Sequence, residues 1–207
     1  VTNPLYTETL FTIEQGATRE NYMEPTMAVY PSFADVFEFE MQEGSKAALA
    51  EPRQLLIPES MARKWFGNTS AVGKKVEAND SKTIISNYFA TEKGNYTVGG
   101  VYKDFPANSI LQNGIYMKMD DKKDMDSWGS ANYNLFIRVD SPASATRLSE
   151  EFSDYFKKNG LNKKMDWLGD FDFRLSRLPD IHFATDVTFD LTPKTSRQTV
   201  RILFAIA

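Results

Sequence analysis

The chain has 207 residues and a formal net charge of -4 without any block of basic residues, which argues against a nucleic-acid-binding surface. Aromatic residues make up 13% of the sequence, so the composition is that of one large or two small folded domains and not of a disordered segment. The chain contains no cysteine, which excludes a disulfide framework, a thiolate zinc site and a cysteine nucleophile.

The N-terminal part of the chain predicts strands separated by a short helix. Residues 6–13 have the β-branched and aromatic content of a strand, and a turn-rich stretch follows them. Serine and aspartate three residues apart, as in a capping box, predict a short helix within residues 32–37. Apolar and polar residues then alternate over residues 37–42, and residues 55–57 are all apolar, so two further strands are expected.

One helix is predicted in the middle of the chain. Within residues 59–66, Met61 and Trp65 lie one helical turn apart on the same face. Gly67 follows directly and is a natural left-handed stop. We therefore expect a helix that ends at this glycine.

The region after this helix is rich in strand and turn signals. Val76, residues 83–89 and residues 96–102 have the composition of strands. The Gly99-Gly100 pair inside the last of these strands indicates a bulge or a close approach of another backbone. Residues 104–109 include a proline and are expected to form a turn.

The C-terminal third repeats the alternation of strand and helix. Apolar residues alternate over residues 133–139, as in a strand. Ser141 and Pro142 then open a helix with one apolar stripe, which Gly160 ends, and residues 171–175 alternate as a closing strand. Strand, helix and strand are thus predicted at both ends of the chain, around a β-rich centre.

The chain finishes in an apolar run, residues 202–207, without a cap or a charge. A membrane-spanning helix needs about 20 such residues, so we interpret this run as the first turns of a truncated membrane helix and the chain as an excised extramembrane domain. The alternative is an amphipathic helix over residues 196–207 that docks on the core of the domain.

Two acidic clusters are the candidates for catalysis or metal binding. Asp166, Asp170 and Asp172 could supply the carboxylate pair of a hydrolase, but they are predicted to lie in a turn and on the solvent face of a strand. The second cluster lacks the alternate spacing and central glycine of a calcium loop, so a solvated loop is expected. Its members are Asp120, Asp121, Asp124 and Asp126. His182, the single histidine, is interpreted as structural.

Several segments occur in an order that resembles a known family. They are VFEF (36–39), IPESMARKWFG (57–67), VGKKV (72–76), YTVGGVYKDFPANS (96–109) and LPDIHF (178–183). Together they resemble the periplasmic domain of MacB-type, FtsX-like ABC transporter permeases, in the form common in Bacteroidetes. The chain departs from the usual family pattern at Ile110, where histidine is common, and at Ala71-Val72, where Pro-Ile is common.

The resemblance implies an α+β fold with two lobes. A porter-like lobe would be built from two strand-helix-strand units, one from each end of the chain, with a smaller β-rich, sabre-like lobe inserted between them. The expected porter-like halves are residues 1–57 and 133–192, and the inserted lobe is residues 58–132. Residues 193–207 would connect to the truncated transmembrane helix.

The resemblance also implies a role without catalysis and without a cofactor or metal. The domain would lie on the periplasmic face of the bacterial inner membrane and relay conformational change between membrane helices and a periplasmic partner or substrate. Its expected partners are the membrane helices of its own parent chain, a separate cytoplasmic ATPase subunit and a periplasmic adaptor or lipoprotein. We expect a dimer in the full transporter and a monomer as an isolated domain.

Two loops are candidate partner-contact sites, because recognition often resides in loops on a rigid scaffold. The candidate residues are Asp120, Asp121, Lys122, Lys123, Asp124, Asn159, Lys163 and Lys164. The competing interpretation is that both loops are solvated connections. Two other functions compete at the level of the whole chain: a ligand-sensing ectodomain of another membrane protein, of the receptor-kinase type, and a secreted hydrolase.

Overall fold

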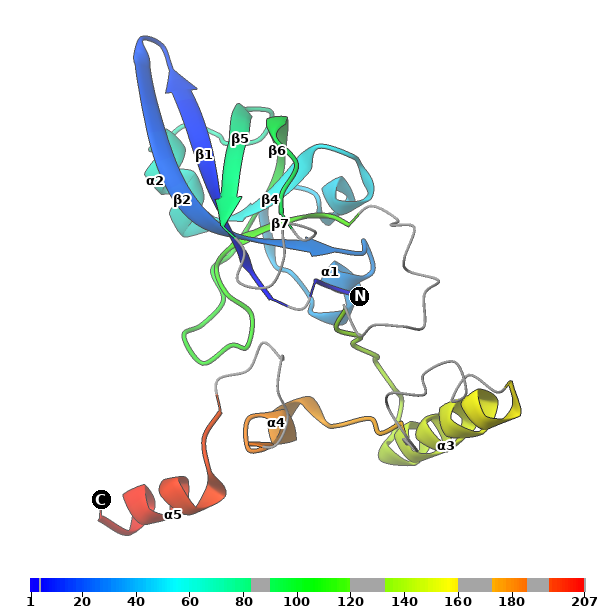
Figure 1. The fold of residues 1–207 in the computed structure, drawn as a ribbon. Coiled ribbons are helices and arrows are strands. Elements are labelled where there is room, and N and C mark those ends of the chain that lie inside the picture. The colour runs from blue at the N-terminus through cyan, green and yellow to red at the C-terminus, as the bar shows by residue number, and fades with distance from the viewer. Residues whose placement is uncertain (4, 83–89, 120–132, 160–172, 186–193, 207) are drawn as a thin grey trace. The chain divides into compact units, whose positions relative to one another are not determined.

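The computed structural model describes residues 1–3, 5–82, 90–119, 133–159, 173–185 and 194–206. These residues divide into two compact units (Figure 1). The first unit contains the described residues up to 119 together with residues 133–136, and the second contains those from 137 onward.

The first unit is built on a β-sheet that closes on itself. Its strands are β1 (Thr7–Gln15), β2 (Thr18–Val29), β3 (Met41–Gly44), β4 (Gln54–Pro58), β5 (Lys75–Lys82), β6 (Gly94–Tyr102) and β7 (Ile115–Lys118). The strand order is β3-β6-β4-β7-β2-β1-β5, and β5 pairs in addition with β6. All strands except β3 therefore form a closed barrel, in which β2 with β7 and β4 with β6 are the parallel pairs.

β1 and β2 form a long hairpin that extends beyond the rest of the barrel (Figure 1). Their pairing ends with Gln15 opposite Thr18, and Gly16 makes the turn at a positive φ of 61°. Of the residues of β2, only 26–29 pair with β7, which also pairs with β4 on its other side. The sequence predicted β1 correctly, but it predicted turns where β2 lies.

The glycine pair in β6 has the role that the sequence predicted. The register between β4 and β6 shifts at this point, as in a bulge. A Cβ atom on Gly99 would lie 2.5 Å from the Cβ of Ala48, and one on Gly100 would lie 2.7 Å from Cε of Met41. The bulge and the close approach are both confirmed: the 3-10 helix η1 (Lys46–Ala50) and β3 leave no room for side chains here.

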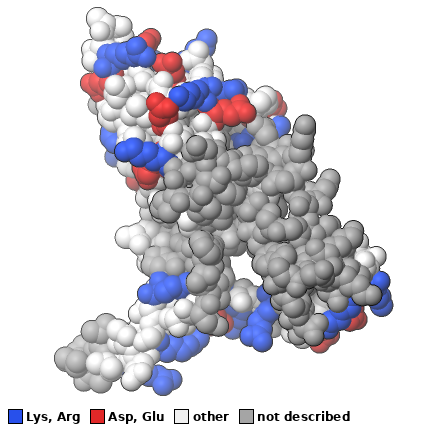
Figure 2. Space-filling model, in the orientation of Figure 1, with Lys and Arg blue, Asp and Glu red and all other residues white. Residues whose placement is uncertain are grey.

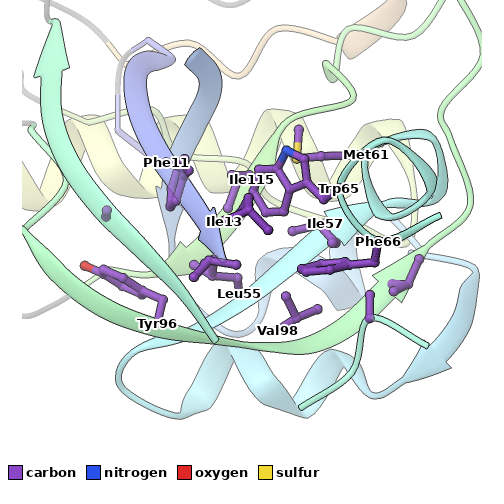
Figure 3. Close-up of a cluster of buried hydrophobic side chains, with 14 of the residues drawn as sticks. Phe11, Ile13, Leu55, Ile57, Met61, Trp65, Phe66, Tyr96, Val98 and Ile115 are labelled. Carbon is purple, nitrogen blue, oxygen red and sulfur yellow. The ribbon is translucent and has the colours of Figure 1, made fainter. Parts of the chain in front are cut away.

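Helix α2 (Glu59–Phe66) has the predicted bounds and supplies a large part of the core. Met61, Trp65 and Phe66 join a buried cluster with residues from the strands (Figure 3). The ring centroids of Trp65 and Phe11 lie 5.6 Å apart. Gly67 ends the helix at a positive φ of 63°, as predicted. The strand residues labelled with them in Figure 3 are Phe11, Ile13, Leu55, Ile57, Tyr96, Val98 and Ile115.

The remaining helices are short, except for one. They are α1 (Phe33–Val36), α3 (Pro142–Lys158), α4 (Leu178–Ile181) and α5 (Arg197–Ile206). The helix predicted after Ser141 is α3, and Ser141 Oγ caps it by accepting a hydrogen bond from the backbone nitrogen of Ser144 at 3.1 Å. Among the helices described, none combines the length and the apolar composition of a membrane span.

Two predicted strands of the C-terminal third are not formed in the described residues. Within residues 133–139, only Asn134 makes an isolated bridge, to Thr2. The described residues of the segment 171–175 belong to no strand. The alternating apolar pattern is present in both segments, but the described part of the chain offers them no neighbouring strand to complete a ladder. The predicted strand over residues 83–89 lies outside the described residues.

The α+β class is confirmed, but the structure places the division of the chain differently from the predicted boundaries. The predicted boundary after residue 57 falls inside β4, and β5, β6 and β7 pair with β1, β2, β3 and β4. Residues 1–57 and the described part of residues 58–132 therefore share one barrel and do not form separate lobes. Of the described residues, 137–159, 173–185 and 194–206 belong to the second unit.

Candidate functional site

Most of the predicted contact residues lie outside the described residues. These are Asp120, Asp121, Lys122, Lys123, Asp124, Lys163 and Lys164. Asn159 is described, and it ends α3: its backbone nitrogen and its Nδ2 donate to the carbonyl oxygen of Tyr155, at 3.0 and 2.8 Å. The Asn159 side chain thus provides a hydrogen bond to a carbonyl group in the last turn of the helix, which is a structural role.

Of the other chemical candidates, only His182 lies among the described residues. Asp166, Asp170 and Asp172 lie outside the described residues. The ring of His182 is partly buried and lies 5.3 Å from that of Phe183. Within the part of the chain that the structure describes, no three His, Cys, Asp or Glu side chains gather as metal ligands.

The loop between β6 and β7, residues 103–114, is instead fixed at several points, and we call it the β6–β7 loop. At its start, the backbone nitrogen of Lys103 donates to the carbonyl oxygen of Glu40 at 2.8 Å. Asp104 Oδ1 then accepts from the backbone nitrogen of Ser60 at 3.0 Å. Ser60 lies in the first turn of α2, where Pro58 at the cap position makes no side-chain hydrogen bond. Asp104 therefore caps α2 from a different element.

Asn113 closes the neck of the loop. Its Oδ1 accepts from the backbone nitrogen of Phe105 at 2.7 Å, and its Nδ2 donates to the carbonyl oxygen of Phe105 at 3.1 Å. One amide side chain thus satisfies both backbone groups of a residue on the opposite side of the loop. This arrangement replaces a strand pair and holds the two ends of the loop together.

Two tyrosine hydroxyls fix the backbone next to the neck. The backbone nitrogen of Gln112 donates to Tyr6 Oη at 3.0 Å, and Tyr116 Oη donates to the carbonyl oxygen of Gln112 at 2.9 Å. The two hydroxyls are 2.6 Å apart, and because the Tyr116 proton is used on Gln112, Tyr6 donates to Tyr116. The result is a closed ring of hydrogen bonds. Burial raises the pKa of Tyr6 and raises the pKa of Tyr116 well above its ordinary value, so both hydroxyls keep their protons.

The same loop is anchored by aromatic packing. Phe105 lies with its ring centroid 5.0 Å from Tyr102 and 5.1 Å from Phe39. Tyr102 is buried and donates to the carbonyl oxygen of Gly114 at 2.7 Å. Burial raises the pKa of Tyr102 well above its ordinary value. Both ends of the loop are therefore tied to the core of the first unit by aromatic side chains.

Helix α2 connects this loop to the hairpin. Near its C-terminal end, Lys64 Nζ lies 2.7 Å from Glu24 Oε1 on β2, and Trp65 Nε1 donates to the same oxygen at 3.3 Å. Glu24 is only 7% exposed whereas Lys64 is half exposed, so a buried carboxylate is paired with a cation that reaches the solvent. The side chain of Gln15 also donates to the carbonyl oxygen of Trp65. One helix thus touches the β6–β7 loop at its first turn and the β1–β2 hairpin at its last.

The second unit has a groove of its own along α3, with a volume of about 950 Å³. Ser153 Oγ and Ser149 Oγ accept from the backbone nitrogens of Phe173 and Leu175, both at 3.1 Å, which attaches this segment to the helix. The ring of Phe173 lies 4.4 Å from that of Phe156. Charges of both signs line the groove, so it has no clear preference for an anion or a cation. They are Asp140, Glu150, Asp154, Lys157, Arg174 and Arg177.

Comparison with known proteins identifies the family of this chain. Residues 4–155 match the sequence profile of the MacB-like periplasmic core domain. The chain belongs to this family. The match contains the whole barrel, the β6–β7 loop and most of α3. No curated protein matches the chain.

Solved structures that match the chain include domains of membrane proteins. A domain described as part of a permease from Porphyromonas gingivalis is 22% identical, with a TM-score of 0.52 over 87% of this chain and 78% of that chain. The periplasmic region of MacB from Actinobacillus actinomycetemcomitans is 14% identical, with a TM-score of 0.46 over 74% and 66%. The extracellular domain of the noncanonic ABC-type transporter YknZ from Gram-positive bacteria is 18% identical, with a TM-score of 0.49 over 84% and 82%. At these identities, the Porphyromonas structure supports the fold alone.

The residues that fix the β6–β7 loop in this MacB-like domain were not singled out by the sequence. Asp104 and Phe105 lie in a segment that carried the family resemblance, but nothing in the sequence assigned them a partner. Tyr6 and Gln112 are separated by 106 positions, and Glu24 and Lys64 by 40. The periodicity of apolar residues in a sequence does not predict contacts between residues so far apart, so these contacts are known only from the structure.

Proposed function

We propose that this chain is the extracytoplasmic domain of an ABC transporter permease, on the periplasmic face of the bacterial inner membrane. It relays conformational change between the membrane helices of its parent chain and a periplasmic partner or substrate, and it catalyses no reaction itself. The observation that carries this proposal is the family match over residues 4–155.

The build of the first unit supports a relay. A closed barrel lacks the free edges of an open sheet, and it is filled by a continuous cluster that includes α2. Because α2 is fastened at both ends, a displacement of the hairpin is carried to the β6–β7 loop through one packed helix. A body of this kind moves as a unit and does not absorb displacement internally.

The expected partners follow from this role. They are the membrane helices of the parent chain, a separate cytoplasmic ATPase subunit and a periplasmic adaptor or lipoprotein, with a dimer of the permease in the full transporter. Helix α5 offers support for a connection to the membrane, since Ile202 and Phe204 are 51% and 81% exposed. Large apolar side chains with this exposure favour an apolar environment outside the domain.

Purification of the tagged parent protein from its own membranes tests this proposal. We expect an ATPase subunit or domain to copurify, and we expect protease added to spheroplasts to cleave within residues 1–207 without prior lysis. Copurification of a kinase would favour the receptor-type ectodomain. Protection of the domain until the cells are lysed would contradict the periplasmic location.

A further inference from the structure

Beyond Lys103 and Asp104, the β6–β7 loop carries no charge, on a chain that is rich in charge. Residues 105–114 contain no Asp, Glu, Lys or Arg, although these residue types make up 25% of the chain. Pro106, Ala107 and Asn108 at the tip are exposed. Around the hairpin, by contrast, acidic and basic side chains are interspersed, and Arg19 there forms ion pairs (Figure 2).

The tip is held in one shape although it is exposed. The backbone nitrogen of Ser109 donates to the carbonyl oxygen of Pro106 at 2.8 Å, and Ser109 Oγ accepts from the backbone nitrogen of Leu111 at 3.0 Å. Leu111 is only 5% exposed, and its burial anchors the second half of the loop. Together with the neck at Asn113, these contacts order the loop before any partner arrives, which lowers the entropy cost of binding.

We propose that residues 106–108 form a docking surface for a periplasmic protein whose facing surface is itself uncharged and hydrogen-bonding. The centres of protein interfaces are depleted in charged residues, as residues 105–114 are. Because residues 105–114 contain no Lys or Arg, the tip offers nothing to an anionic lipid headgroup, whose attraction depends on basic side chains. The inference rests on the proposed function in one respect: the domain meets a protein partner outside the membrane.

Photocrosslinking in the parent transporter tests the position of this surface. A photoreactive amino acid replaces Ala107 in the full-length protein in its own cells, and the matched control carries it at Ala17, which is exposed at the hairpin turn. We expect a protein adduct from position 107 and none from position 17. An adduct from position 17 alone would overturn the loop assignment while leaving the proposed function intact. The absence of a protein adduct at both positions, or adducts with lipid only, would count against both.

Binding of the crosslinked protein, once identified and purified, then tests the chemistry. The full-length transporter in detergent is titrated with it at low and high ionic strength, and we expect the Kd to change by less than about threefold because no exposed charge is involved. Asn108→Asp and Asn108→Lys should each weaken binding by at least about tenfold, since either buries an unpaired charge. Asn108→Gln and the control Ala17→Asp should leave the Kd within about threefold of wild type. Strong salt dependence, or tolerance of both charges at position 108, would overturn the proposal.

Discussion

A single amide side chain closes the β6–β7 loop. Asn113 satisfies both backbone groups of Phe105 across the neck of the β6–β7 loop. Aspartate could not replace it, because an ionised carboxylate accepts but does not donate. The loop thus depends on one residue whose chemistry is both donor and acceptor.

Asn113→Ala should release the neck of the loop. Loss of two hydrogen bonds, at about 1 kcal/mol each, predicts a destabilisation of about 1–2 kcal/mol. Hydrogen exchange should accelerate over residues 105–113 and remain unchanged in β1 and β4. Asn108→Ala is the matched control at an exposed position of the same loop, and it should have no effect. Equal exchange in the two variants would show that Asn113 does not close the loop.

The buried tyrosines predict a loss of stability at alkaline pH. Burial raises the pKa values of Tyr102 and Tyr116 in the folded protein, whereas the unfolded chain releases these protons near pH 10. Stability from these groups is therefore intact below about pH 10 and falls above it, by up to about 1.4 kcal/mol per pH unit for each tyrosine. Tyr116→Phe should lower stability at pH 8 but make the alkaline decline shallower. Denaturant unfolding at pH 8, 10 and 11 measures this, and an unchanged slope would contradict the assignment.

At the scale of elements, α2 is the one that the sequence predicts most completely. Its apolar spacing and Gly67 give both bounds correctly, because local periodicity and a local stop decide them. The packing against Phe11 and the cap from Asp104 could not be predicted, since both partners lie far away in the sequence. The same limit applies to the candidate contact loops. They are candidates because recognition often resides in loops on a rigid scaffold, and the sequence does not show which loop is held by residues far away in the chain.

Two strands escaped prediction for a related reason. β2 contains Pro25 and several polar residues, so its composition is that of a turn-rich segment with a weak preference for strand. Its pairing with β1 stabilises it as a strand. β7 is only the four residues Ile115–Lys118, and it is held between β2 and β4. Conversely, residues 133–139 alternate as a strand should, yet only Asn134 makes a bridge. Tertiary pairing decides such cases.

Asp104→Ala should weaken α2 from outside the helix. Loss of a side-chain cap costs about 1 kcal/mol, and the negative charge near the helix N-terminus is lost as well. Asp104→Asn keeps an acceptor and should recover most of the stability. Urea unfolding of the three proteins gives the comparison. If alanine and asparagine destabilise equally, the carboxylate oxygen is not acting as a cap.

At the scale of the whole molecule, the domain should bind no nucleotide. The sequence lacks a phosphate-cradling loop and a nucleophile activated by a base, and the proposed role leaves ATP hydrolysis to a separate subunit. Calorimetric titration of the domain with ATP and magnesium should therefore give no heat of binding. Micromolar affinity would contradict the non-catalytic role.

We propose that displacement passes between this domain and the membrane through the segment that contains α5. Ser196 Oγ caps this helix by accepting from the backbone nitrogen of Thr199 at 2.9 Å. A continuous helix transmits displacement, whereas a Gly/Ser linker behaves as a flexible coil. The segment between Arg197 and Arg201 is therefore the place to interrupt the relay.

The most direct test inserts about seven Gly/Ser residues between Arg197 and Arg201 of the full-length transporter. A second variant carries an Ala/Glu/Lys insertion of the same length, which continues the helix for about two turns. Transport and ATP hydrolysis are measured for both variants in the same membranes. The relay predicts that the Gly/Ser variant hydrolyses ATP but does not transport, and that the helical variant keeps transport. Transport at the normal rate through the Gly/Ser variant would contradict the relay and make the domain a passive docking module.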